Sequence, residues 1–220
     1  MRVLVKGVAM AADTKSRMIG AAIGLLQRHG LAAMSFTEVL AESGAARGAI
    51  YHHFPGGKQQ LALEAARQNA ADVRGHLHEL PDSTPREVVE AFLDNIRPVV
   101  EASARGGGCA VAAVTIDGGA AITDQSGLLA VAAEGFAGWV GELTGKLTHA
   151  GMSPSEAADL ATLMVVTLEG AHVLCRAAGS VAPFDRAAAA VLSALPDADR
   201  PGSDRGGARL GRKRGSNPAP

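Results

Sequence analysis

The stretch from Gly44 to Lys58 reads GAARGAIYHHFPGGK and decides the fold of the chain. Its centre predicts a short helix, which residues 54–57 (Phe-Pro-Gly-Gly) end because proline and glycine interrupt helices. Just upstream, Ser35 and Glu38 have the spacing of a capping box, so a second short helix is predicted to start there and to stop at Gly44. Two short helices joined by a glycine-containing turn describe a helix-turn-helix.

A longer helix is predicted upstream of this pair. Apolar residues recur with helical spacing between Asp13 and His29, Asp13 or Thr14 can cap the start, and Gly30 can stop the helix. Residues 1–12 are expected to be a disordered leader. Their apolar segment is too short for a signal peptide. The three helices are expected to enclose one small apolar core: Leu25, Phe36, Val39, Ile50 and Phe54.

The rest of the chain is predicted to be helical as well. A connecting helix is expected over 58–80, and a proline-containing break at 81–85 then begins a second domain. The expected fold is all-α, with a three-helix helix-turn-helix domain over 13–57 and a C-terminal helical domain over 81–196. Residues 197–220, mostly glycine, proline and charge, are expected to be a disordered basic tail. Helices of the second domain are predicted near 85–104, 109–117, 124–150, 154–179 and 184–195.

The composition favours helices and excludes several classes of protein. The 220 residues are 47% hydrophobic but only 3% aromatic, and such aliphatic cores suit packed helices better than sheets. Two cysteines give no disulfide framework, which is typical of a cytoplasmic protein. The most apolar helical run, 160–168, is shorter than the roughly 20 residues that cross a bilayer, so no membrane partner is expected.

The charge is divided unevenly along the chain. Residues 1–80 carry a formal charge of +3, residues 81–199 carry −9 and residues 200–220 carry +5. A basic front and an acidic body are typical of a protein that binds nucleic acid through one domain only. Arg47 and Lys58 also stand at predicted helix starts, where the helix dipole repels cations. A phosphate at these positions would remove that conflict, and Tyr51 and His52 lie close by along the chain.

These residues resemble those of a known family. The stretch from Gly44 to Lys58, with residues 35–41 (SFTEVLA) and 18–22 (MIGAA), is similar to the recognition-helix region of the TetR family of transcriptional repressors. The Gly108-Cys109 step before an Ala/Val helix resembles the LmrA/YxaF-like branch of that family. The resemblance implies a homodimer that reads a palindromic DNA operator and is released by a small-molecule inducer bound in the C-terminal domain. No catalysis, no cofactor and no metal are expected.

The resemblance also suggests which residues touch DNA. Thr37, Tyr51, His52 and Lys58 are expected to hold phosphates, while the start of the second short helix faces the bases. Relatives often have Ser or Thr at that start where this chain has alanine, so Arg47 remains the side chain able to bind a guanine bidentately. The full expected DNA-binding set is Ser35, Thr37, Ala46, Arg47, Gly48, Ala49, Tyr51, His52 and Lys58.

The second domain is expected to bind the ligand and to form the dimer. Its helix over 154–178 is apolar around much of its circumference, so it needs cover on more than one side. With residues 184–195 it is expected to pair with the symmetry-related copy in a four-helix bundle. The few aromatic residues favour an aliphatic or compact polycyclic inducer. The expected ligand-binding residues are Phe92, Ile96, Phe136, Trp139, Met164, Thr167, His172 and Cys175.

Two other functions remain open on the sequence. A helical DNA-binding or architectural protein without an inducer response would have the same first domain. An enzyme would use Cys109, because a thiol after three glycines at a helix start can have a lowered pKa. Only His149 or His172 could then act as the base, and both are distant along the chain. We therefore expect that the protein is not an enzyme.

Overall fold

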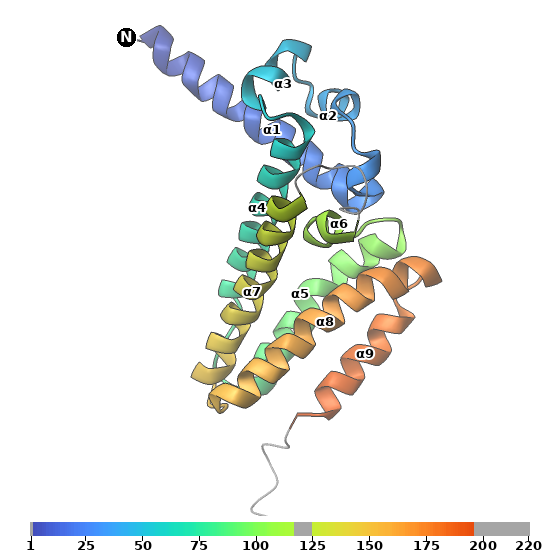
Figure 1. Ribbon diagram of the computed structural model, residues 1–220. Helices are drawn as coiled ribbons and strands as arrows, with labels where there is room; N and C mark the ends of the chain where they lie inside the picture. Colours follow the sequence, from blue (N-terminus) through green and yellow to red (C-terminus); the bar gives the residue numbers. More distant parts are fainter. Residues whose placement is uncertain (1, 117–124, 196–220) are drawn as a thin grey trace, which may run out of the picture.

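The computed structural model describes residues 2–116 and 125–195, with side chains over 13–116 and 127–195. Every regular element in these ranges is a helix, as the sequence predicts. Figure 1 shows the N-terminal helices at the blue end of the chain, followed by the helices that build a second domain. The expected disordered tail, 197–220, lies outside the described residues.

Local capping signals fix the helix-turn-helix. Helix α2 (Phe36–Ser43) starts at a capping box: the Ser35 amide donates to Glu38 Oε2 at 3.1 Å, and the Glu38 amide donates to Ser35 Oγ at 3.3 Å. Gly44 ends α2 in the left-handed region, with φ of 63°. Helix α3 follows over Arg47–His53 and α4 over Gly57–His78. The predicted boundaries of the motif are confirmed.

The first helix differs from its prediction at its start. Helix α1 spans Arg2–Ala33, so it begins before Asp13 and Thr14, where the sequence predicts its start, and within the expected leader over 1–12. The physical reason is that no proline lies between Arg2 and Asp13, and the segment ends in Ala, Met, Ala and Ala, which are strong helix formers. The stop at Gly30 is confirmed, because its φ of 76° and ψ of 176° interrupt the helix before a last short turn.

The second domain has the helices that the sequence predicts. They are α5 (Pro85–Ala104), α6 (Ala110–Ile116), α7 (Gln125–His149), α8 (Pro154–Ala178) and α9 (Ala182–Ser193). Helix α9 begins before Phe184, its expected start, because Pro183 sits in the first turn, where a helix tolerates proline.

The second domain packs around the pair α4 and α7, which lie side by side in Figure 1. A Cβ on Gly135 of α7 would stand only 3.0 Å from the Cβ of Ala70 on α4, so small residues let these helices approach closely. Trp139 of α7 is fully buried, and its Nε1 donates to the carbonyl oxygen of Ala70 at 2.9 Å. Helix α8 packs on α7 and α5, and α1 packs on α4 and α6.

Helix α8 is long and apolar enough to cross a bilayer by length and composition alone. That is more than its 160–168 run suggested, because the whole helix contributes. Part of its apolar surface is nevertheless buried against the rest of the chain, including Ala161, Met164 and Leu168. These contacts are typical of a core helix.

Candidate nucleic-acid interface and inter-domain cavity

Helix α3 has a buried face and an exposed face. Ile50 and, just beyond the helix, Phe54 are fully buried. With Leu25 and Val39, also buried, they form the expected small core, while Phe36 is half-buried at its edge. The other face is turned to solvent and carries the residues predicted to face DNA: Ala46, Arg47, Gly48, Tyr51 and His52 are exposed, and Ala49 is half-buried.

Arg47 is the first residue of α3. None of the ion pairs or hydrogen bonds within the described part of the chain includes its side chain. The N-cap residue is Ala46, whose side chain cannot bond to the helix start. The guanidinium is therefore exposed and able to meet an outside acceptor.

Tyr51 and Thr37 are both exposed to solvent. The Tyr51 ring packs edge-on against Phe36, with centroids 5.9 Å apart and planes at 89°, yet the residue remains 62% exposed. Thr37 is exposed in the first turn of α2. Packing of the ring and a free hydroxyl coexist in Tyr51, as its amphipathic side chain allows.

Ser35 and Lys58 have roles within the fold. The Ser35 hydroxyl donates to Glu38 at 2.7 Å, and these hydrogen bonds lower the pKa of Glu38. The Nζ of Lys58 donates to the carbonyl oxygen of Ala32 at 3.0 Å, which ties the start of α4 to the end of α1. A phosphate contact from either residue stays a prediction.

An ion pair and a hydrogen bond hold α1 against α2. Arg28 pairs with Glu42, and Arg17 donates to the carbonyl oxygen of Ser43 at 3.2 Å. These contacts fix the motif to the longer helix that also reaches the second domain.

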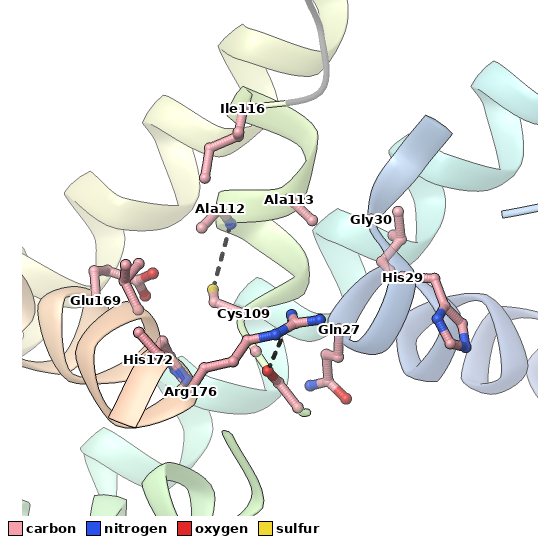
Figure 2. A pocket seen from close by; sticks show the side chains of 15 residues that line it. Gln27, His29, Gly30, Cys109, Ala112, Ala113, Ile116, Glu169, His172 and Arg176 are labelled. Atoms are coloured by element: carbon pink, nitrogen blue, oxygen red, sulfur yellow. Dashed lines mark hydrogen bonds between the residues drawn. The ribbon is translucent and has the colours of Figure 1, made fainter. Parts of the chain in front are cut away.

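An open pocket of about 510 Å³ lies where α1, α6 and α8 meet. We call it the junction pocket, and Figure 2 shows residues from all three helices around it. A smaller space of about 90 Å³, the inner cavity, reaches from the same place toward α4, α5 and α7. Both are lined by Gln27, Gly108, Cys109, Glu169 and His172; the inner cavity adds residues such as Val73, Ile96 and Trp139.

The predicted ligand-binding residues divide between these cavities and the core. Ile96, Trp139 and His172 line the inner cavity. The other five line neither space: Phe92, Met164 and Cys175 are buried, and Phe136 and Thr167 are half-buried. Sequence reasoning missed Gln27, Glu169 and Arg176. Glu169 carried a usable signal, because it is a lone acid in an otherwise apolar part of α8.

Three titratable groups meet at the boundary of the two cavities. Burial raises the pKa of Glu169 to about 7 from its ordinary value of 4.5. Burial, reinforced by the charge of Glu169, raises the pKa of Cys109 far above its usual range, the opposite of what a nucleophilic thiol requires. Burial lowers the pKa of His172 to about 4, so its imidazole is neutral at pH 7. Cys109 therefore stays protonated and lacks the thiolate that a cysteine nucleophile needs.

Arg176 joins the two domains. It projects from α8 and donates to the carbonyl oxygen of Arg28 on α1 at 3.0 Å and to that of Gly107, before α6, at 3.5 Å. The backbones also touch, since a Cβ on Gly108 would lie 2.8 Å from the carbonyl oxygen of Gln27. A second route between the domains therefore exists beside α4.

Fold and interface together define the class of protein: an all-helical regulator with a helix-turn-helix. Residues 18–65 match the family described as "Bacterial regulatory proteins, tetR family", and residues 85–190 match "Transcriptional regulator LmrA/YxaF-like, C-terminal domain". The chain belongs to the TetR family of transcriptional regulators, in its LmrA/YxaF-like branch.

Individual relatives agree with this assignment. An HTH-type transcriptional regulator of Mycobacterium tuberculosis is 32% identical over 173 residues, which cover 78% of this chain and 88% of the relative. LmrA of Bacillus subtilis is 26% identical, over 84% of this chain and 96% of its own. A TetR regulator from Legionella pneumophila has the same fold, with a TM-score of 0.69 at 20% identity over 82% of this chain and 96% of its own. These names point to regulators of transcription, which are not enzymes.

Proposed function

We propose that the protein is a ligand-responsive repressor. It acts in the cytoplasm as a homodimer, binds a palindromic operator through α3 of each copy, and leaves the operator when a small molecule binds in the second domain. The observation that carries the proposal is the exposed face of α3, which holds Arg47 and Tyr51. The opposite face is anchored by Ile50 and, just beyond the helix, by Phe54, both fully buried.

Reading of DNA is proposed to depend on few side chains. Arg47 can donate two hydrogen bonds to O6 and N7 of one guanine, whereas Ala46 and Ala49 can offer only methyl contacts. Thr37, Tyr51, His52 and Lys58 are proposed to bind phosphates, which position α3 in the major groove without reading sequence. Ser35 contributes by holding the start of α2.

The dimer is proposed to form through α8 and α9. Helix α8 exposes a stripe of aliphatic side chains, in which Val166, Val173 and Leu174 are each about 60% exposed. These positions recur at helical spacing, so they form one face. Phe184 of α9 is buried within its own chain, beside Arg97, and does not belong to that face.

Release by a ligand is proposed to start at the junction pocket. A ligand shifts an equilibrium only if it prefers one conformation. The junction pocket is lined by α1 of the first domain as well as by α6 and α8, so a ligand there contacts both domains at once. This placement favours a ligand-responsive regulator over an architectural DNA-binding protein.

The test uses the full-length protein and duplexes selected from genomic fragments. Fluorescence anisotropy should give tight, salt-dependent binding to one palindrome, because phosphate contacts release counterions. A compound library is then screened for thermal shifts, and the hits are tested for release of the duplex. Absence of sequence preference would contradict the proposal, and DNA binding that no stabilising compound affects would favour the architectural alternative.

A further inference from the structure

One oxygen of a carboxylate at the junction pocket lacks a hydrogen-bond partner. Among the side chains that the structure describes, Oε1 of Glu169 is the buried oxygen or nitrogen atom without a hydrogen bond. Such atoms are nearly always paired in folded proteins, because burial removes their bonds to water. Figure 2 shows Glu169 on α8 facing α6 across the pocket. An orphaned oxygen at the wall of a cavity indicates a hydrogen-bond donor that comes from outside the chain.

No basic side chain among residues 13–116 and 127–195 neutralises Glu169. The neighbouring thiol of Cys109 stays protonated, and the neutral His172 lies one turn further along α8. Arg176 also lines the pocket, but its guanidinium is engaged by the carbonyl oxygens of Arg28 and Gly107. Figure 2 shows His29 at the other end of the pocket from Glu169. Only burial and the Cys109 hydrogen bond shift the pKa of Glu169, so no basic side chain acts on it.

His172 supplies a second acceptor beside the carboxylate. The Ser103 hydroxyl donates to the carbonyl oxygen of Val99 at 3.0 Å and lies 2.6 Å from Nδ1 of His172. Since its one proton is used, Ser103 accepts from Nδ1–H, and Nε2 of the neutral ring is left as an acceptor. Glu169 and His172 both line the junction pocket, and two acceptors in one pocket suit a ligand group with several donors.

The remaining wall of the pocket is apolar. Leu26 of α1 and Ala112, Ala113 and Ile116 of α6 surround the polar end. An apolar wall with a few convergent polar groups is typical of a small-molecule site. Because Glu169 is itself largely buried, attraction between its carboxylate and a cation is stronger than at the surface.

We propose that the junction pocket binds a compact apolar organic amine, with its protonated nitrogen held by Glu169 and His172 and its hydrocarbon part against α1 and α6. The proposal rests on the proposed function in taking this ligand to be the effector that releases DNA. Binding of the amine itself can be measured without DNA.

The probes are three compounds with one hydrocarbon cage and different charge: 1-aminoadamantane, 1-adamantanol and adamantane-1-carboxylate. Each is titrated into the full-length protein and followed by calorimetry and by the fluorescence of Trp139, the single tryptophan, which lines the inner cavity. We expect the amine to bind at least about tenfold more tightly than the alcohol, and the carboxylate to bind most weakly. Equal affinities, a preference for the carboxylate or no binding of the amine would overturn the proposal.

Two variants locate the cation. Glu169→Gln keeps the shape of the side chain and removes its charge, so it should weaken amine binding about tenfold and leave alcohol binding unchanged. Asp159→Asn removes an exposed carboxylate from the same helix and is the matched control, which should change neither. If both variants bind the amine as the wild type does, Glu169 is not its partner and the proposal fails.

Proton release gives an independent readout. Because Glu169 is partly protonated near pH 7, amine binding should release protons in calorimetry with buffers of different ionisation enthalpy. The release should disappear in Glu169→Gln, and its persistence there would contradict the assignment. If the amine binds but leaves DNA bound, the site stands and the amine is not the effector that releases DNA. If a neutral hit releases DNA while the amine does not bind, the reverse holds.

Discussion

At the scale of single residues, Arg47 is the side chain proposed to read a base of the operator. Arg47→Ala should weaken binding to the selected operator by about 1–3 kcal/mol and relax the preference at one guanine, because a bidentate contact is lost. Competition binding against operators changed at single positions measures both effects. Arg105→Ala, which removes an exposed arginine from the second domain, is the control. An unchanged base preference would show that Arg47 does not read the sequence.

Glu169 makes the free energy of unfolding depend on pH, and comparison with Glu169→Gln separates its contribution from those of other groups. Its pKa is raised from 4.5 to about 7, so the folded state holds its proton more tightly and stability falls as pH rises through this window. Glu169→Gln should therefore be stabilised relative to the wild type by about 2–3 kcal/mol at pH 8 and lose that advantage near pH 5. Denaturant unfolding at several pH values measures it, with Asp159→Asn as the control. A difference that does not change between pH 5 and pH 8 would contradict the buried charge.

His172 opposes that effect in the wild type. Its pKa is lowered from 6.5 to about 4, so the unfolded state binds the proton more tightly and stability rises with pH between these values. The two slopes partly cancel, which is why the comparison with Glu169→Gln is more informative than the wild-type profile alone.

At the scale of elements, Arg176 connects α8 to the end of α1. Arg176→Ala should speed amide hydrogen exchange at the last turn of α1, since the hydrogen bond to the Arg28 carbonyl is lost. The loss of global stability should be small, about 1 kcal/mol or less, because the side chain is exposed. Exchange measured by mass spectrometry would test this, with Arg186→Ala on α9 as the control. Unchanged exchange at α1 would show that α8 does not brace the first domain.

The helices were predictable because their signals are local. Ser35 and Gly44 act within one turn of α2, as the sequence predicts. The structure shows that Thr84 and Ser153 cap the starts of α5 and α8 in the same local way. The start of α1 was not predicted, because Asp13 offered a cap signal inside a segment that continues as a helix. Local signals thus predict where a helix can begin more reliably than where it does begin.

The cavities were predictable only in part. The sequence predicts ligand-binding roles for large apolar residues such as Phe92 and Met164, but in the structure their side chains are buried in the core. The junction pocket forms instead where small residues and the ends of α1, α6 and α8 meet, and contacts between such distant segments leave no periodic pattern. The exposed face of α3 agreed with the prediction because it follows from one short helix.

At the scale of the whole molecule, dimerisation decides whether two recognition helices can act together. Val166→Glu should give a monomer that still folds, because Val166 is 60% exposed in the single chain, and its operator affinity should fall steeply. Sedimentation at micromolar protein measures the state. Leu129→Glu, at an exposed apolar position of α7, is the control. A Val166→Glu dimer would place the interface elsewhere.

The central claim is that α3 of each copy enters the major groove of a palindromic duplex. Hydroxyl-radical footprinting of the full-length protein on its selected operator tests it directly. The expected result is two protected half-sites whose centres lie about 34–36 Å apart, one helical turn of DNA. Failure to bind any duplex in dilute buffer, or protection without two-fold symmetry, would contradict it.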